Sequence, residues 1–556
     1  MCTRSFKKLN AVFSALMLAA LPLVFAACKK PCDEPTVMLS TVSPISAGEQ
    51  VTVPTSHADT SKNGIDTYII LNNENTTING EGASFSDSVL TISKGGSYLL
   101  KGRLSDGKIV VDLKEAGGRV FLRLGGITVR SSSDSPLSIT SSNGETHIVL
   151  EENTVNELSD TSGESVRFKK DREKEYTPAV IFGKSNILLE GDGTLKITAK
   201  YKKGIYSERE LEVLGGNIDI ESANDALGAK NSIAFKGGTL DAVSGAQGIR
   251  TGKSDAGKGS IYISGGSLKI ESALDCIQSA SNLTVTGGTF DLSSGGGSTG
   301  KAEKKGHTND LPRVKSSIVS SGEQTIDVNE SKAVRAEKSI TVSNGDFAVN
   351  SLDDAFYSGE KIHISDGNFD IKTDSNAFYS SSRISVSGGN IKVDYCAEGV
   401  EGKDVSISGG SIYINTEGSG FGEKGSVLQT GGTVVAFGAK SGVNGKSSYT
   451  VTGGTVLCGG DLPARKATVR RNAELSVTAT FPANTLFAVT DEGGKTLFCL
   501  SIPQNSKSIW FSSSDLSIGD RYKIYSGGIN TGVSKNGIYY GSNYTPGWLV
   551  DTVTAK

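Results

Sequence analysis

The chain has 556 residues and a formal net charge of −3, with 69 glycines and only 12 prolines. This near-neutral balance excludes a global basic field for nucleic acid and a polybasic membrane-binding surface. Seven cysteines occur without a CxxC motif, so we expect small buried thiols rather than a metal bound through sulfur.

The first part of the chain is typical of an export signal. Basic residues precede an apolar run from 11 to 27, which predicts a signal peptide over residues 1–27. Small residues stand directly before Cys28, which predicts a lipoprotein whose lipid is attached to this cysteine; an ordinary secretory signal with an incidental cysteine is the alternative. Residues 28–59 would then be a tether, and we expect a bacterial membrane lipoprotein at the outer membrane or cell surface.

Residues 60–178 contain short apolar or alternating runs between turns rich in glycine, asparagine and serine. Such runs predict β-strands. Their irregular spacing indicates an N-terminal β cap followed by imperfect first coils of a repeat structure. The predicted strands are 68–71, 89–92, 108–111, 119–122 and 147–150.

Residues 179–463 carry a repeat of about 22 residues. Each unit combines alternating apolar strands with glycine-rich turns, and three short strands with three turns need roughly 20 residues. A fixed period of this kind predicts a β-solenoid, in which each coil buries its apolar side chains against its neighbours. In the last part of the repeat the turns are 344–345, 366–367, 388–389, 409–410, 431–432 and 453–454, at spacings of 22, 22, 21, 22 and 22 residues.

Two other segments interrupt or end this repeat. Residues 295–317 form a polar insertion rich in glycine and lysine, which we interpret as a flexible surface loop rather than a functional lid. Residues 464–556 abandon the period but keep strand-like runs, and they predict a C-terminal β domain that caps the solenoid. The predicted strands there are 473–480, 486–489, 495–502 and 521–526.

Polar residues recur at one position of the coil, just before the small residue that opens each unit. Stacked coils would place these side chains about 4.8 Å apart. Asp354, Asn376 and Glu398 are consecutive, Asp353 adds a carboxylate, and hard oxygen ligands at this pitch suit Ca²⁺. The alternative is that these residues only form turns and cap strand ends. The whole column is Lys203, Asp225, Gln247, Asp275, Lys332, Asp354, Asn376, Glu398 and Ser419.

The lysines of this column offer a further alternative to calcium. Lys203 could pair with Asp225 on the next coil, and Lys332 could pair with Asp354 in the same way. An ammonium group at either position would take the place of a metal ion.

A second column lies two residues along from the same position in each coil. There Tyr357 and Tyr379 are expected to stack on the outer face, between Arg335 and Glu401. Aromatic faces with flanking polar groups suit a sugar ring, so these four residues are candidate carbohydrate ligands. The alternative is an aromatic ladder that only stiffens the sheet.

The repeated motifs resemble a known family. Asp353-Asp354-Ala355-Phe356 and Glu398-Gly399-Val400-Glu401-Gly402 are similar to signature sequences of a bacterial carbohydrate-binding, calcium-binding parallel β-helix family related in fold to pectate lyases. The resemblance runs from about residue 65 to the end. It implies an all-β, right-handed parallel β-helix of about 22 residues per coil, and it implies binding of acidic plant-type polysaccharide such as pectin.

The resemblance also implies where calcium would be held, namely by acids of the coil turns. The chain departs from the family pattern at Ser375-Asn376, at Ser419-Gly420 and at Lys332, so fewer ions or weaker binding are expected. Carried over by position, the calcium candidates are Asp225, Asp275, Asp353, Asp354 and Glu398, to which the spacing argument adds Asn376.

These observations favour a monomeric, surface-anchored lipoprotein that binds an acidic polysaccharide and touches the membrane only through its lipid. A non-catalytic adhesin or structural solenoid is the alternative. A calcium-dependent polysaccharide lyase, with Lys332 or Arg335 as the base, is a third. We expect no enzyme, because fold likeness to lyases does not carry activity.

Overall fold

Within the residues that the computed structural model describes, all regular elements are β-strands. None of these residues belongs to a helix that is long and apolar enough to cross a membrane. The predicted signal peptide, Cys28 and the tether lie outside the described part of the chain. The structure describes residues 64–113, 118–141, 144–161, 179–252, 257–301, 331–422, 425–444, 448–461, 472–541 and 543–556.

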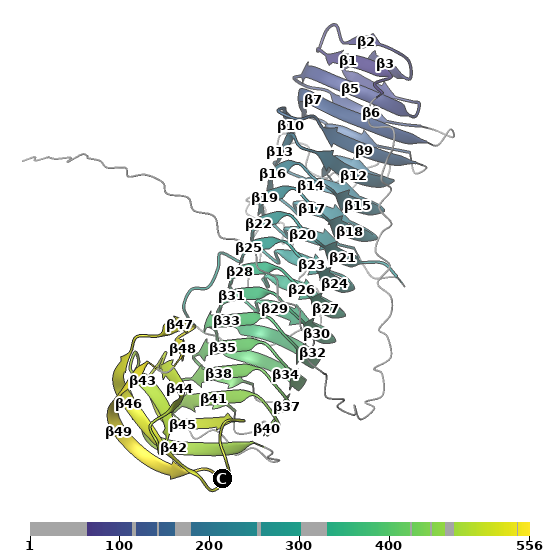
Figure 1. The fold of residues 1–556 in the computed structure, drawn as a ribbon. Coiled ribbons are helices and arrows are strands. Elements are labelled where there is room, and N and C mark those ends of the chain that lie inside the picture. The colour runs from purple at the N-terminus through teal and green to yellow at the C-terminus, as the bar shows by residue number, and fades with distance from the viewer. Residues whose placement is uncertain are drawn as a thin grey trace, which may run out of the picture. The chain divides into compact units, whose positions relative to one another are not determined.

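Most strands pair in parallel with the strand three places later, so the chain winds in coils and equivalent strands stack (Figure 1). Phe356 pairs with Phe378, for example, and the neighbouring Asp354 and Asn376 are 22 residues apart. We call this array the parallel stack; it confirms the predicted all-β solenoid in its general form and is compatible with a parallel β-helix.

The parallel stack contains three columns of strands, one for each strand of a coil. The long strands β32 (Asn376–Val386) and β34 (Glu398–Ile407) each continue from the first column into the second. The first column contains β11 (Ala179–Gly183), β14 (Lys203–Ser207), β17 (Leu227–Ala229), β20 (Ile249–Thr251), β23 (Ile277–Ser279), β26 (Val334–Ala336), β29 (Phe356–Ser358), β36 (Ser419–Phe421) and β39 (Ser441–Val443). The second contains β12 (Asn186–Gly191), β15 (Glu210–Val213), β18 (Ser232–Phe235), β21 (Ser260–Ile263), β24 (Asn282–Val285), β27 (Ser339–Val342), β30 (Lys361–Ile364), β37 (Ser426–Gln429) and β40 (Ser448–Val451). The third contains β13 (Thr194–Ala199), β16 (Asn217–Ser222), β19 (Thr239–Ser244), β22 (Ser267–Ser272), β25 (Thr289–Ser294), β28 (Asp346–Ser351), β31 (Asn368–Thr373), β33 (Asn390–Tyr395), β35 (Ser411–Thr416), β38 (Thr433–Gly438) and β41 (Thr455–Gly460).

The core of the parallel stack is built from inward side chains in register. In β28, exposed and buried residues alternate along the strand, as a two-residue side-chain period requires. Phe347 stacks on Phe290 at a ring-centroid distance of 4.3 Å and on Phe369 at 4.8 Å. The residues predicted to face inward are buried, which confirms the assignment of faces: Ile340, Val342, Phe347 and Val349.

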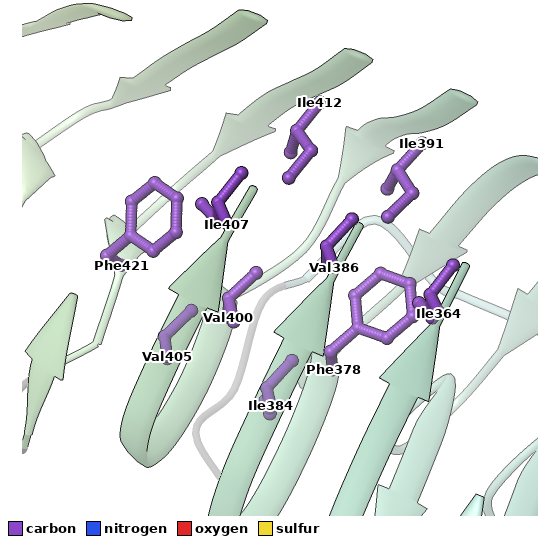
Figure 2. Close-up of a pocket in the computed structure, with 10 residues that line it drawn as sticks. All are labelled: Ile364, Phe378, Ile384, Val386, Ile391, Val400, Val405, Ile407, Ile412 and Phe421. Atoms are coloured by element: carbon purple, nitrogen blue, oxygen red, sulfur yellow. The ribbon is translucent and has the colours of Figure 1, made fainter. Parts of the chain in front are cut away.

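One small cavity interrupts this packing. Val400 pairs with Phe378 on one side and with Phe421 on the other, so a short side chain stands between two rings. Figure 2 shows the ten apolar residues around the resulting space, which measures about 10 Å³. A cavity of this size holds at most one water molecule, and an apolar lining leaves it dry.

The first residues of the predicted insertion are fixed rather than loose, which corrects the expectation of a flexible loop for 295–301. The backbone N–H of Thr299 donates to Asp374 Oδ2 at 2.9 Å, and the N–H of Gly300 donates to Asp374 Oδ1 at 3.2 Å. The hydroxyls of Ser298 and Thr299 both donate to the same carboxylate at 2.5 Å. A carboxylate with this many donors holds the segment on the coil of Asp374; residues 302–317 lie outside the described residues.

The N-terminal strands continue the parallel stack with longer and less regular elements. β1 pairs in parallel with β5 and antiparallel with β2, and β3 pairs antiparallel with β4. All five predicted runs fall on strands. The strands are β1 (Thr67–Leu71), β2 (Thr77–Asn79), β3 (Ala83–Ser86), β4 (Val89–Ile92), β5 (Gly96–Leu104), β6 (Lys108–Val111), β7 (Arg119–Ser131), β8 (Leu137–Ile139), β9 (Glu145–Leu150) and β10 (Val155–Asp160).

The C-terminal strands change direction. β45 pairs antiparallel with β41 and with β42, and the remaining strands form a six-stranded sheet in the order β47-β48-β44-β43-β46-β49. The predicted strands all fall here, whereas β45, β47, β48 and β49 were not predicted. Domain boundaries remain predictions. The strands are β42 (Ala473–Phe481), β43 (Leu486–Asp491), β44 (Thr496–Ser501), β45 (Ser506–Ser513), β46 (Arg521–Asn530), β47 (Val533–Lys535), β48 (Ile538–Tyr540) and β49 (Tyr544–Thr554).

Four cysteines in the described residues are buried and free, as expected from the sequence. Burial raises the pKa of the Cys276 and Cys396 thiols to about 12. A thiol with so high a pKa is a poor nucleophile and a poor metal ligand at neutral pH, so these residues serve as small apolar side chains.

Candidate functional site

The acids of the predicted calcium column share one structural role. Each accepts a hydrogen bond from the backbone N–H of the residue at the same position one coil later. This N–H lies beside a turn, and an unpaired buried N–H would be costly. The finding supports the alternative that these acids cap strand ends. The pairs are Asp225 Oδ1 with Gln247 N (3.4 Å), Asp275 Oδ1 with Lys332 N (2.8 Å), Asp354 Oδ1 with Asn376 N (2.9 Å) and Glu398 Oε2 with Ser419 N (3.0 Å).

Lysine ammonium groups occupy two places in the same column. Lys203 Nζ lies 2.8 Å from Asp225 Oδ2, which is the pairing expected from the sequence. Lys332 Nζ lies 2.6 Å from Asp353 Oδ2, so the partner is Asp353 rather than the expected Asp354. Burial lowers the pKa of Lys332, but the surrounding carboxylates outweigh it and raise the pKa above its usual value. Lys332 is therefore charged.

Asp275 stands at the centre of a buried polar region. Burial raises the pKa of its carboxyl group to about 6, although Arg335 and Lys332 act in the opposite direction. The adjacent amides, Gln247 and Gln278, are also buried, and within the described residues none of their side-chain polar atoms has a hydrogen-bond partner. A buried carboxyl group and two buried amides from successive coils therefore lie together in this region.

The two candidate tyrosines stack as expected but are less exposed than expected. The rings of Tyr357 and Tyr379 lie 5.3 Å apart at an interplanar angle of 11°. Lys332 Nζ lies 5.1 Å and Arg335 Cζ 5.3 Å from the centroid of the Tyr357 ring. Tyr357 is 3 % exposed, because these neighbours pack over it, whereas Tyr379 is half-buried. The expected open pair of rings is therefore reduced to one accessible ring at Tyr379.

The remaining candidates, Arg335 and Glu401, are also buried. Arg335 Nε donates to Glu337 Oε1 at 2.9 Å, which ties the guanidinium to the turn that follows its strand, β26. The sequence reasoning missed Glu337. Glu337 directly follows the last residue of β26, two positions after Arg335, and this i, i+2 spacing of opposite charges is the signal that could have identified it.

On earlier coils of the first strand column, the cations of β14 and β20 are more accessible. The side chains of Lys203 and Arg250 are 22 % and 35 % exposed, and Arg250 Nη1 lies 4.0 Å from Asp225 Oδ2. Lys203 Nζ also lies 4.6 Å from the centroid of the Tyr206 ring, which is itself half-buried. Where a cation lies beside an aromatic face, the cation can pair with the carboxylate of an acidic sugar while the aromatic face contacts the sugar ring.

The metal ligands expected from the sequence are not gathered into one cluster. Within the described residues, no group of three or more His, Cys, Asp and Glu side chains could hold a metal ion. Asp225 and Asp353 each have a lysine ammonium group within 3 Å instead. Among the six candidates, Asp354, Asn376 and Glu398 occupy consecutive coils of the acid column.

A family model described as "Carbohydrate-binding domain-containing protein" matches residues 86–377, which is more than half of the chain. The chain belongs to this carbohydrate-binding domain family. The matched part includes the acid column from Asp225 to Asn376 and both tyrosine-column cations, Arg250 and Arg335. Glu398, Glu401 and the whole C-terminal sheet lie beyond it.

Two further comparisons place the chain among similar proteins. It is 28 % identical over 159 residues to a carbohydrate-binding domain-containing protein of Acetivibrio thermocellus, a match covering 28 % of this chain and 54 % of that protein. The chain thus spans about half the length of this relative. It is also 28 % identical to a solved polysaccharide lyase-like protein from C. thermocellum, in a gadolinium derivative, covering 42 % of this chain and 92 % of that one. The TM-score of 0.39 is too low to establish a shared fold.

Proposed function

We propose that this carbohydrate-binding domain protein captures an acidic, plant-type polysaccharide such as pectin along the first column of the parallel stack. The main support for carbohydrate binding is the match of residues 86–377 to the family model. The acidic character of the glycan is supported by Lys203 and Arg250, whose side chains are partly exposed beside an aromatic ring. Each would pair with a uronate carboxylate, and Tyr379 would contact a sugar ring.

Calcium is proposed only at Asp354, Asn376 and Glu398. Their oxygens are the hard ligands that calcium prefers, and they stand on successive coils. Asp354 Oδ1 already accepts two hydrogen bonds from Asn376, so a bound ion would use other oxygens of the site. At Asp225 and Asp353 the residues do not fit an ion, because an ammonium group stands there.

The cellular setting and the finer architecture remain part of the same proposal. We propose a right-handed parallel β-helix of about 22 residues per coil, with β caps at both ends. The mature chain would be a monomeric lipoprotein, anchored through Cys28 in the outer membrane or at the cell surface. Mass spectrometry of the N-terminal peptide from the native host tests this anchor, because a diacylglyceryl group on Cys28 changes its mass.

The test of carbohydrate binding is retention of the purified chain on polygalacturonate, in buffer with calcium and in buffer with EGTA. Tyr379→Ala and the double variant Lys203→Ala/Arg250→Ala are expected to lose retention. If the protein were instead an adhesin that binds no glycan, the wild type itself would not be retained. Tyr357→Phe is the matched control, because it keeps the buried ring. Retention unaffected by all of these changes would refute this placement of the glycan.

A lyase is the second candidate function, since Lys332 and Arg335 could in principle act as bases. The structure favours binding over catalysis, because both side chains are buried and each is paired with a carboxylate. Ultraviolet absorbance of unsaturated products during incubation with polygalacturonate is the measurement that separates them. We expect no increase in absorbance with time.

A further inference from the structure

A cleft of about 350 Å³ opens on the outer face of the third strand column, and none of the first-column residues described above lines it. Residues of β25, β28, β31 and β33 form its floor. Lys535, the last residue of β47, and Asn536, in the turn between β47 and β48, line its opposite side. The turn residues, Asn536 and Gly537, both have positive φ angles, of 52° and 74°. This is the two-residue Asn-Gly hairpin turn, and it brings Lys535 against the parallel stack.

A ladder of hydrogen bonds crosses the floor from coil to coil. Asn368 Nδ2 donates to Asp346 Oδ1 at 2.7 Å, and Asn390 Nδ2 donates to Asn368 Oδ1 at 3.0 Å. Lys535 Nζ donates to Asn390 Oδ1 at 2.8 Å and so links the hairpin to the ladder. Each primary amide has two N–H donors, so a ladder that uses one donor of each asparagine leaves the second for a ligand.

The floor is hollowed two residues further along the strands, at the next position on the same face. Ala348 pairs with Asp291 and with Asp370, so a methyl group stands between two longer side chains. Lys392 Nζ lies 2.6 Å from Asp394 Oδ2 and 3.6 Å from Asp370 Oδ2 on the same face. The cleft therefore combines a small apolar hollow with amide, carboxylate and ammonium groups.

The charge of this lining differs from that of the first column. Two carboxylates, Asp346 and Asp370, face two ammonium groups, Lys392 and Lys535, so the charges of the lining balance. A polyanion gains little from such a surface, whereas sugar hydroxyls can both donate to the carboxylates and accept from the amides and ammonium groups. Equivalent side chains recur about every 4.8 Å along the stack, close to the length of one pyranose unit.

From this geometry we propose that the cleft is a second glycan site, which binds one or two units of a neutral saccharide chain running along the Asp346–Asn368–Asn390 ladder. The inference rests on the carbohydrate binding proposed above but concerns another face and another class of glycan. A volume of about 350 Å³ is at the small end of ligand pockets, which agrees with a site for a short segment. Asn390, Lys392 and Lys535 lie beyond residue 377, where the match to the family model ends.

The test is calorimetric titration of the whole mature chain with cellohexaose, xylohexaose and mannohexaose, together with retention on polygalacturonate. Asn368→Ala/Asn390→Ala is expected to weaken binding of the neutral oligosaccharide at least tenfold and to leave polygalacturonate retention unchanged. Ala348→Arg fills the hollow without removing the ladder and is expected to have the same effect. Lys269→Ala is the matched control, because Lys269 lies on the same column and is exposed, outside the cleft.

Three outcomes separate the possibilities. Neutral oligosaccharides bound equally well by both cleft variants would overturn the cleft while leaving carbohydrate binding intact. A wild-type chain that retains polygalacturonate but binds none of the three oligosaccharides would also overturn it. A wild-type chain that binds no glycan at all would refute the proposed function itself. Melting temperatures of the variants show whether a loss reflects the site or unfolding.

Discussion

Lys332 Nζ lies 2.6 Å from Asp353 Oδ2, and the two side chains are only 7 % and 3 % exposed. The pair joins two successive coils, since the residues are 21 positions apart. Two charges removed from water in this way are costly to separate, because the remaining one has lost its nearest counter-ion. The pair is therefore a structural element of the parallel stack, placed where the sequence suggested a metal ion.

Lys332→Met is expected to lower the free energy of unfolding by about 3–5 kcal/mol, the range found when one partner of a buried ion pair is removed. Denaturant unfolding followed by circular dichroism measures this change. Lys269→Met is the control, because its pair with Asp241 is exposed and such pairs contribute about 0–1 kcal/mol. Equal effects of the two substitutions would show that burial does not matter here.

Asp354 separates the capping role from the calcium role. Asp354→Asn keeps an oxygen for the backbone N–H of Asn376, so stability should change little, whereas Asp354→Ala leaves that N–H unsatisfied and costs about 1–3 kcal/mol. If the proposed calcium site is correct, Asp354→Asn also removes the rise in melting temperature that calcium produces in the wild type. A wild type whose melting temperature is the same in calcium and in EGTA would leave only the capping role.

Filling the cavity beside Val400 should stabilise the protein. Val400→Ile adds one methylene group to a space of about 10 Å³ between two phenylalanine rings, and we expect a gain of up to about 1 kcal/mol. Val334→Ile is the matched control at the same column position, because Val334 does not line this cavity and an added methylene in close packing costs stability. Differential scanning calorimetry distinguishes the two. A lower melting temperature for Val400→Ile would mean that the cavity cannot accept the group.

His147 makes stability depend on pH. Its Nε2 lies 2.8 Å from Glu145 Oε1 and its Nδ1 lies 3.0 Å from Glu190 Oε1. Burial lowers the pKa of His147, but the hydrogen bonds and charges of the two glutamates outweigh it, so the pKa is raised above 6.5. A raised folded-state pKa gives stability that is complete below about pH 6.5 and is lost as the pH rises through the folded value.

The corresponding experiment compares wild type with His147→Gln from pH 5.5 to pH 9. The stability advantage of the wild type should be largest at the acidic end and should shrink as the pH rises. His363→Gln is the control, because His363 Nδ1 lies 2.8 Å from the Ser385 hydroxyl rather than from a carboxylate. A difference between wild type and His147→Gln that is constant across this range would contradict the prediction.

The fold could largely be read from the sequence because the repeat ties each side chain to a face. A strand such as Ser339–Val342 places Ile340 and Val342 in the core, and the paired residues one coil later, Ile362 and Ile364, are also apolar and buried. The stacking of Tyr357 on Tyr379 followed from the same register. Periodicity determines which residues are neighbours along a column.

Periodicity alone could not give the depth of burial or the choice of ion-pair partner. Tyr357 is covered by Lys332 and Arg335, which reach across from an earlier coil, and Lys332 bonds to Asp353 rather than to Asp354. Such contacts depend on where long side chains turn at the end of a strand. A position in the repeat does not specify this.

The asparagine ladder shows a signal that was present but not used. Asp346, Asn368 and Asn390 each follow the glycine of a turn directly, at the regular period. The contribution of Lys535 could not have been found in this way, because it comes from a hairpin 145 residues away from Asn390. Long-range contacts of this kind become visible only once both elements are placed.

The backbone pairing of the parallel stack joins Ile277 to Val334 and Ser294 to Ser351 without a shift in register, as it does between ordinary coils. Ser294 and Ser351 are nevertheless 57 residues apart rather than 22. This junction therefore tolerates a long excursion of chain without disturbing the register on either side. It is a natural grafting point, at which a reporter or an additional binding domain could be spliced in while the scaffold keeps its shape.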